Sequence, residues 1–242
     1  TAQIAAGYFN GMARNYILTD LEKKGMSLPV KNKTLIRFNP NLKSINYMGP
    51  GIVALLLTIT SMFLTSIGVV REKEQQTLDT LLMSRLTPFE IYLGKTLPMA
   101  ILGIIEMFVG IGVVMVVFNI SLRGSLGALF LAALIFLFAI LSYALLISII
   151  STSQQQALFF SWFSMVIFIL LSGLFTPVEN VPPAFHWLAD INPLRYLIQI
   201  IREIFLKGNG ILYFYKELLI LLGITGVVFS LSLMNFKRMV TK

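Results

Sequence analysis

The tripeptide at 94–96, Gly-Lys-Thr, has the residue types that close a phosphate-binding loop, where backbone amides and a lysine hold phosphates. That loop also needs a glycine five positions before its Gly-Lys pair, and Phe89 stands there. It needs a preceding strand as well, whereas residues 87–90, Thr-Pro-Phe-Glu, have the form of a capping box that starts a helix. The sequence therefore does not predict nucleotide binding by this chain.

Two further residues could carry chemistry. Glu106 is the only acid deep in an apolar segment, and an ionisable group in a membrane is a functional hypothesis by default. It could line a transport path, or hold its helix to a neighbour through a Ser, Thr or Tyr side chain. His186 is the only histidine and there are no cysteines, so a His-cluster or thiolate metal site within the chain is excluded. No motif joins His186 to a nucleophile and an orienting acid, so catalysis is not expected.

A pair of arginines lies on a short amphipathic segment over 193–207. Arg195 and Arg202 stand two helical turns apart, so they could bind lipid phosphate or an anionic substrate, or extend to the headgroups. Asn192 supplies an N-cap and Gly208 ends the helix. At about 15 residues this helix is too short to span a membrane, so we expect it to lie at the interface or dip partway in. Its apolar face comprises Leu194, Leu197, Ile198, Ile201, Ile204 and Phe205.

The elements that must position these residues are membrane helices. The chain has 242 residues, of which 57% are hydrophobic and 12% charged. That charged share is about half that of a soluble domain. We therefore predict an all-α polytopic membrane protein with five transmembrane helices, each able to cross about 30 Å of hydrocarbon. The predicted spans lie near 50–70, 97–118, 126–150, 156–175 and 211–235.

Charge gives the spans an orientation. The basic C-terminal tail over 237–242 indicates a cytoplasmic end. With five crossings, residues 71–96 and 151–155 are then cytoplasmic, whereas 119–125 and 176–210 lie outside. Much of the net charge of +8 sits near the two ends of the sequence, and we do not interpret it as a signal of nucleic-acid binding.

Residues 71–96 form the longest polar interruption between the spans, and we call this segment the elbow. Its first part, 71–85, is expected to form a short amphipathic helix. Glu72 and Glu74 lie at the expected start of that helix, where carboxylates favour the positive end of the helix dipole. The second part begins at Thr87 and runs into the next span. The leucines on the apolar side are Leu78, Leu81 and Leu82.

Residues 1–48 are soluble in character. We predict an amphipathic helix ending near Gly25 and a short strand over 34–38. One helix and one strand cannot build a core, and the sequence begins at Thr1 without an initiator methionine. We therefore expect 1–48 to be the end of a larger domain and 49–242 to be a transmembrane domain.

Three stretches carry a family resemblance. They are Phe38-Asn39-Pro40-Asn41-Leu42 followed by Pro50-Gly51; Arg71-Glu72-Lys73-Glu74 with Thr77-Leu78, Leu81-Leu82, Pro88 and Leu93-Gly94-Lys95; and the short helix after Asn192-Pro193, before a last span and a basic tail. Over nearly the whole chain this resembles the permease, the membrane-spanning subunit, of ABC type-2 exporters with a large external domain between their first two membrane helices. The family often has glycine where Gln76 stands and glutamate where Asp79 stands.

The resemblance implies six helices in the intact subunit and makes 1–48 the C-terminal part of an extracytoplasmic domain. It implies that two permeases, identical or paralogous, pair in the membrane. Each docks through its elbow on an ATP-binding subunit, which holds ATP and magnesium, while the permease itself binds no cofactor. By the resemblance, the residues that couple to the ATPase are Glu72, Glu74, Thr77, Leu78, Leu81, Leu82 and Pro88.

The expected function is therefore ATP-driven export of an amphiphilic or hydrophobic substrate across the bacterial cytoplasmic membrane, with this chain as a non-catalytic permease. The elbow leucines could fill a groove on the partner while the charges set the register. A secondary transporter or channel is the alternative. That class should show charged or broken helices near the midplane or an internal repeat, and the sequence has only Glu106 and no repeat. A structural subunit of a complex that does not transport also stays open.

Overall fold

The chain divides into two compact units, Thr1–Pro40 and Asn41–Lys242. In the first unit Tyr16 and Asp20 are helical, and the remainder of the expected helix and the strand predicted over 34–38 lie outside the described residues. The second unit contains all the elements discussed below. The computed structural model describes Tyr16, Asp20 and residues 44–77, 85–175 and 178–240.

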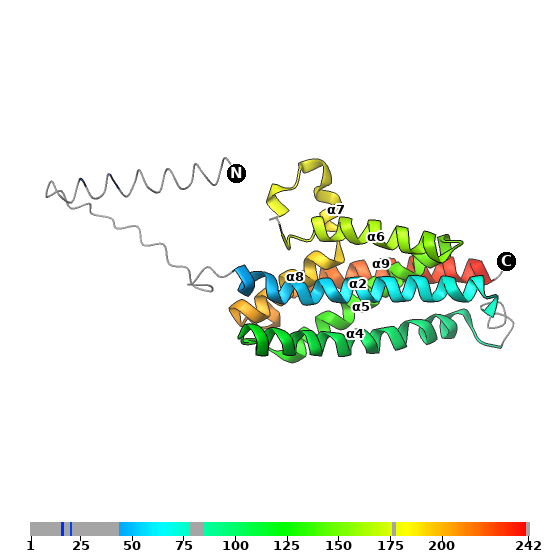
Figure 1. The fold of residues 1–242 in the computed structure, drawn as a ribbon, viewed down its shortest axis with the longest axis horizontal. Helices are drawn as coiled ribbons and strands as arrows, with labels where there is room; N and C mark the ends of the chain where they lie inside the picture. The colour runs from blue at the N-terminus through cyan, green and yellow to red at the C-terminus, as the bar shows by residue number, and fades with distance from the viewer. Residues whose placement is uncertain (1–15, 17–19, 21–43, 78–84, 176–177, 241–242) are drawn as a thin grey trace. The chain divides into compact units, whose positions relative to one another are not determined.

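The second unit is a bundle of helices, and the described residues contain no strand (Figure 1). Four helices are long and apolar enough to cross a membrane, and a fifth, α6, is apolar but has only 17 residues. The all-α membrane fold predicted from the sequence is confirmed, and the chain is an integral membrane protein. The bounds are α2 (Ser44–Glu74), α4 (Pro88–Phe118), α5 (Leu126–Ile150), α6 (Gln154–Leu170) and α9 (Tyr215–Val240).

Helix α5 lies at the centre of the bundle. It packs against α2, α4 and α9 and contacts α6 and α8. In its most apolar stretch 61% of the helix is buried, compared with 22% in α4 and 11% in α9. The exposed side chains of α4 and α9 are largely Leu, Ile, Val and Phe, which suits contact with lipid tails. The centre of the fold is therefore a protein-packed helix, and the periphery is apolar.

Short helical turns connect α6 to α9. They are η1 (Val178–Asn180), η2 (Pro183–Phe185), α7 (His186–Asp190), α8 (Pro193–Arg202), η3 (Glu203–Lys207) and η4 (Ile211–Tyr213). Asn192 caps α8 by accepting a hydrogen bond from the amide of Leu194 at 3.0 Å. Gly208 ends η3 at a φ of +69°, a backbone conformation that glycine adopts without strain. The predicted bounds of this segment, 193–207, are confirmed.

The surroundings of α8 differ from the sequence-based expectation. The helix packs against α2, α5, α6 and α9, and its apolar face is buried in the main core. Tyr196 and Ile200, which lie off that apolar face, are also buried. Protein therefore covers the apolar face of α8, and the expectation that this helix lies at the membrane interface or dips partway in stays a prediction. The apolar face is satisfied by protein side chains instead of lipid, and the amphipathic pattern alone does not distinguish the two.

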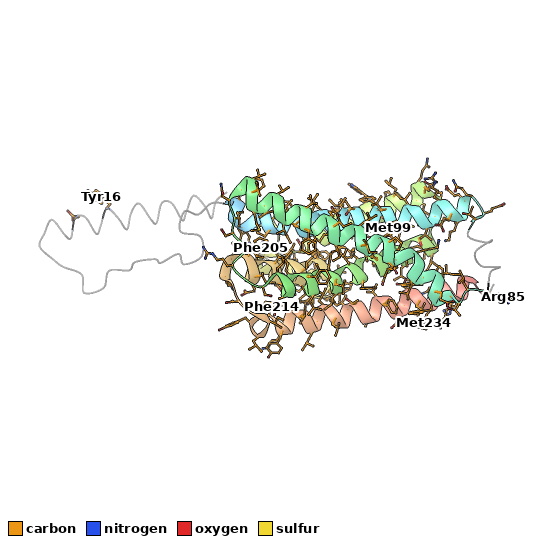
Figure 2. The ribbon with its side chains drawn as sticks, turned by 90° about the horizontal axis from the view of Figure 1, so that it is seen from below. Tyr16, Arg85, Met99, Phe205, Phe214 and Met234 are labelled. Carbon is orange, nitrogen blue, oxygen red and sulfur yellow. The ribbon has the colours of Figure 1, made fainter. Side chains whose placement is uncertain are left out.

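The two ends of the bundle are composed of different connections. Figure 2 shows Arg85 and Met234 at one end and Phe205 and Phe214 at the other. We call the first the elbow end, because α2 finishes and α4 starts there. The end of α9 lies at the same end of the bundle (Figure 1). The opposite end holds the α4–α5 loop and the turns between α6 and α9.

Candidate functional site at the elbow

Helix α2 continues further into the elbow than the sequence indicated. Residues 71–74 form its last turn, so the prediction of a separate helix starting at Arg71 is wrong. The helix breaks at Gln76, which has a φ of +57°. The Thr77 hydroxyl then donates a hydrogen bond back to the carbonyl of Glu72 at 3.2 Å. Glu72 and Glu74 therefore lie at a helix C-terminus, not at the positive end of a helix dipole, and need partners from other elements.

Lys73 finds its partners at the end of α5. Its ammonium group donates to the carbonyls of Ser148, Ile149 and Ser151 at 2.5, 3.0 and 3.3 Å. The last carbonyls of a helix have no partner within that helix and form the negative end of its dipole. A half-buried lysine side chain from α2 therefore satisfies the C-terminus of the central helix.

Glu74 lies against the start of the next helix. Its carboxylate accepts a hydrogen bond from the backbone amide of Gln154 at 2.9 Å and a second from the side-chain amide of the same residue. Ser153 caps the helix as well, by accepting from the amide of Gln156 at 3.2 Å. A carboxylate at a helix N-terminus meets both the free amides and the positive end of the dipole. Glu74 thus holds the start of α6.

Glu72 makes the third contact of this turn, an ion pair with Lys95 of α4. The Lys95 side chain is only 11% exposed, compared with 38% for Glu72. Thr96 bonds to the carbonyl of Tyr92 within α4 at 3.0 Å. The 94–96 tripeptide is therefore the interior of a helix, as the sequence analysis expected. We call Glu72, Lys73 and Glu74 the α2 junction, because these consecutive residues bind α4, α5 and α6.

Helix α4 begins with the predicted capping box. The Thr87 hydroxyl accepts from the Glu90 amide at 3.3 Å, and the Glu90 carboxylate accepts from the Thr87 amide at 2.7 Å. Pro88 is the first helical residue, where its missing amide proton costs no hydrogen bond. The start of α4 is thus fixed by local sequence, independently of any partner.

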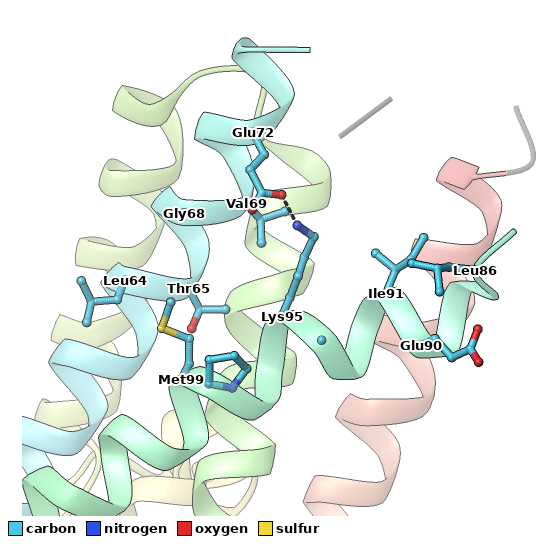
Figure 3. A pocket seen from close by; sticks show the side chains of 12 residues that line it. Leu64, Thr65, Gly68, Val69, Glu72, Leu86, Glu90, Ile91, Lys95 and Met99 are labelled. Carbon is cyan, nitrogen blue, oxygen red and sulfur yellow. Dashed lines mark hydrogen bonds and ion pairs between the residues drawn. The ribbon is translucent and has the colours of Figure 1, made fainter. Parts of the chain in front are cut away.

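A pocket of about 430 Å³ lies between α2 and α4, beside this site. Figure 3 shows Glu72 and Lys95 joined across its upper wall, with Leu64, Thr65 and Met99 below them. Leu86 and Glu90 lie on the side where α4 begins. The pocket therefore has a charged end and an apolar end.

The structure brings some of the predicted coupling residues together and does not describe others. Glu72, Glu74, Thr77 and Pro88 lie at the facing ends of α2 and α4. Leu78, Leu81 and Leu82 lie outside the described residues. Sequence reasoning missed Lys73, Lys95 and Gln154 as partners. A lysine in the last turn of α2 was a visible signal, but nothing local indicated which helix end it would meet.

Glu106 sits midway along α4 and accepts a hydrogen bond from the hydroxyl of Thr60 on α2 at 2.5 Å. This is one of the two arrangements that the sequence left open, a polar contact between neighbouring helices. A role for Glu106 in a transport path stays a prediction.

The arginines on α8 have different surroundings. Arg195 forms an ion pair with Asp190 at 2.5 Å. Arg202 lies 3.7 Å from the ring centre of Tyr47 on α2 and donates to the carbonyl of Gly173 at 3.1 Å, just beyond α6. Arg202 therefore links α2, α6 and α8 at the end of the bundle opposite the elbow. Contact with lipid or anion stays a prediction for both.

No group of His, Cys, Asp or Glu side chains in the described part of the chain could hold a metal ion. His186 is exposed, and its ring shares a hydrogen bond with the carbonyl of Val181 at 2.8 Å. The described charged groups of the elbow are instead bonded to the ends of neighbouring helices.

The sequence of this chain is similar to those of known transport proteins. The profile described as ABC-2 type transporter matches residues 24–206. A protein of Escherichia coli K12 named probable multidrug ABC transporter permease YbhR is 35% identical over 242 residues, covering 99% of this chain and 65% of that protein. A second, probable multidrug ABC transporter permease YbhS, is 29% identical over 98% of this chain and 64% of that protein.

A eukaryotic relative is much longer than this chain. ABC transporter G family member 20 of Dictyostelium discoideum is 29% identical over 190 residues, which are 78% of this chain but only 26% of that protein. The chain thus spans a little under two thirds of the bacterial relatives and about a quarter of the eukaryotic one. The likeness extends across α2 to α8, which includes the elbow.

Proposed function

The chain belongs to the ABC-2 type transporter family, and from this premise we propose that it is part of the permease of an ATP-driven exporter. The observation that carries the proposal is the α2 junction. The turn that enters the elbow is bonded to α4, α5 and α6, so a movement of the elbow would be transmitted to these three helices.

The proposed partner is an ATP-binding subunit that docks on the elbow. ATP and magnesium would be held by that subunit, and this chain's residues would transmit movement. The leucines Leu78, Leu81 and Leu82 would contact the partner, since the charged groups of the α2 junction are bonded to other helices of this chain. The elbow ends of α2 and α4 would then move together, because the Glu72–Lys95 pair joins them.

We place this protein in the bacterial cytoplasmic membrane, with the elbow and the C-terminus in the cytoplasm. The support is the shared end of elbow and C-terminal helix, together with Lys237 and Arg238 on the last turn of α9. A second permease, identical or paralogous, would complete the membrane part. The substrate would be amphiphilic or hydrophobic, which suits the apolar bundle and the relatives named multidrug permeases.

Co-purification tests the proposal. The full-length protein, extracted in mild detergent, should retain a separate ATP-binding subunit, and Leu81→Asp should release it. The matched control is Arg238→Glu, which changes an exposed charge at the same end of the bundle outside the elbow. Glu74→Lys should also release the ATPase, but it breaks the contact with Gln154, so its melting temperature must be measured in parallel.

Two results would contradict the proposal. One is the absence of any bound ATPase in the wild type. The other is Leu81→Asp binding the ATPase as well as wild type does. A secondary transporter or a structural role would then be the better-supported function.

A further inference from the structure

We propose that the pocket between α2 and α4 binds the positively charged head and first methylenes of a cationic amphiphile that enters from the membrane. This deepens the proposed function, on which it rests, by giving the substrate class a place on the chain. At about 430 Å³, the pocket lies within the range of small-molecule sites.

The charged end of the pocket favours a cation. Two carboxylates, those of Glu72 and Glu90, and a single ammonium group, that of Lys95, are among the lining groups. Glu72 and Lys95 lie together, and Glu90 lies apart from them on the side where α4 begins (Figure 3). Lys95 is the more buried member of its ion pair, and the Glu72 side chain stays 38% exposed. Glu90 accepts only from Thr87 among its described hydrogen bonds. The lining groups therefore carry a net charge of −1, counting two carboxylates against one ammonium group.

The other end of the pocket suits an alkyl chain and one polar contact. Leu64, Val69 and Met99 line it with apolar surface. Thr65 also lines it and is 2% exposed, yet its hydroxyl oxygen has no hydrogen-bond partner among the described residues. A buried hydroxyl without a partner is unusual and costs free energy unless a ligand satisfies it. Thr65 lies two helical turns from Glu72, so one molecule with a polar head and a short chain can reach both.

The space itself results from small residues and a proline. Gly68 of α2 and Gly94 of α4 line the pocket, and a Cβ added to either would meet nothing within 4 Å. Pro98 lies inside α4, where it cannot donate to the carbonyl four residues earlier, that of Gly94. The first side-chain carbon of a leucine at position 68 would therefore enter open space in the pocket.

Direct binding tests the inference. The probe is radiolabelled dodecylamine, protonated at pH 7, added to the full-length protein in phosphatidylcholine nanodiscs, with empty nanodiscs as the partition control. We expect saturable binding that Gly68→Leu abolishes. Gly112→Leu is the matched control, because it lies on α4 away from the pocket and its added Cβ also meets nothing within 4 Å. Dodecyl sulfate, with the same chain and opposite charge, should not compete.

Two charge variants should change the binding affinity in opposite directions. Glu90→Gln keeps the capping geometry and should weaken binding about tenfold, since it removes one of the two carboxylates. Lys95→Met frees Glu72 and should strengthen binding, which a structural role for Lys95 does not predict. The inference is overturned if uptake equals that of empty nanodiscs, if Gly68→Leu binds as wild type does, or if dodecyl sulfate competes equally. The assay contains no ATP and no partner, so its failure leaves ATPase co-purification, and with it the proposed function, intact.

Discussion

At the scale of single residues, Gln76 has a backbone conformation that its residue type disfavours. Its φ of +57° lies in the left-handed region, which costs a residue with a Cβ about 1 kcal/mol. Glycine often occupies this position in the family that the sequence resembles. The turn that ends α2 is therefore retained here with a residue that fits it less well.

We expect Gln76→Gly to raise the free energy of unfolding by up to about 1 kcal/mol, partly offset by the extra freedom of glycine in the unfolded chain. Thermal unfolding in detergent, followed by tryptophan fluorescence, measures the effect. Gln75→Gly is the control, because Gln75 is not among the residues with positive φ. Equal loss of stability in both variants would show that the left-handed turn carries no strain.

Glu106 allows a second residue-scale prediction. Its hydrogen bond from Thr60 joins α4 to α2. In a double-mutant cycle, Thr60→Val and Glu106→Leu should show a coupling of about 0.6 to 1.7 kcal/mol, the range for such bonds in membranes. Equilibrium unfolding in mixed micelles gives the four free energies that the cycle needs.

Glu106→Gln separates the two roles of that residue. The amide can still accept from Thr60, so stability should stay near wild type. Unchanged transport in this variant would assign Glu106 to helix packing alone. A loss of transport at unchanged stability would support the alternative that the sequence raised, in which Glu106 lines a transport path.

At the scale of elements, the α2 junction explains how one turn positions three helices. Lys73 meets carbonyls at the negative end of α5, and Glu74 meets amides at the positive end of α6. Each charge therefore faces the dipole of opposite sign. Adjacent residues of α2 thus hold the chain reversal between α5 and α6 from both sides.

We predict that Lys73→Met destabilises the protein by about 1 to 3 kcal/mol, because it leaves the α5 carbonyls without a donor. Glu74→Ala should chiefly speed amide exchange at the start of α6, where Gln154 loses its acceptor. Hydrogen–deuterium exchange of peptides covering 145–160 measures the effects of both variants at the end of α5 and the start of α6. Arg71→Met is the matched control, since Arg71 is exposed on the same turn. Exchange that matches this control in either variant would argue against the junction.

Local signals in the sequence predicted the helices well. The bounds of α5 were predicted without error, and the capping box at Thr87 and the Asn192 cap of α8 are confirmed. These features depend on residues a few positions apart. The junction could not be predicted, because it depends on which helix ends meet. The burial of α8 was missed for the same reason, since an apolar face does not say whether lipid or protein covers it.

At the scale of the whole bundle, polar contacts join the helices at both ends. The α2 junction binds α4, α5 and α6 at the elbow end. Arg202 joins α8 to Tyr47 of α2 and to the carbonyl of Gly173 at the opposite end. Between these ends the contacts are mostly apolar. Such a bundle can transmit movement along α2, because both of its ends are bonded to the helices around it.

The orientation of the bundle gives the last prediction. The chain has no cysteine, so single cysteines can be introduced and labelled with a membrane-impermeant maleimide. Gln75→Cys and Arg238→Cys sit at the elbow end, and Ser121→Cys and Asn180→Cys sit in exposed connections at the other. We expect the first pair to react only in inverted membrane vesicles and the second pair only in intact cells.

The two ways in which this experiment can fail have different meanings. If all four positions react from the opposite side, the fold stands and the proposed orientation is wrong, so the elbow could not meet a cytoplasmic ATPase. If the members of one pair react from different sides, the arrangement of α2, α4, α6 and α9 is itself wrong, because helices joined in this order place both members of each pair at one end. The expected pattern would put the α2 junction on the side where ATP is available, which coupling through the elbow requires.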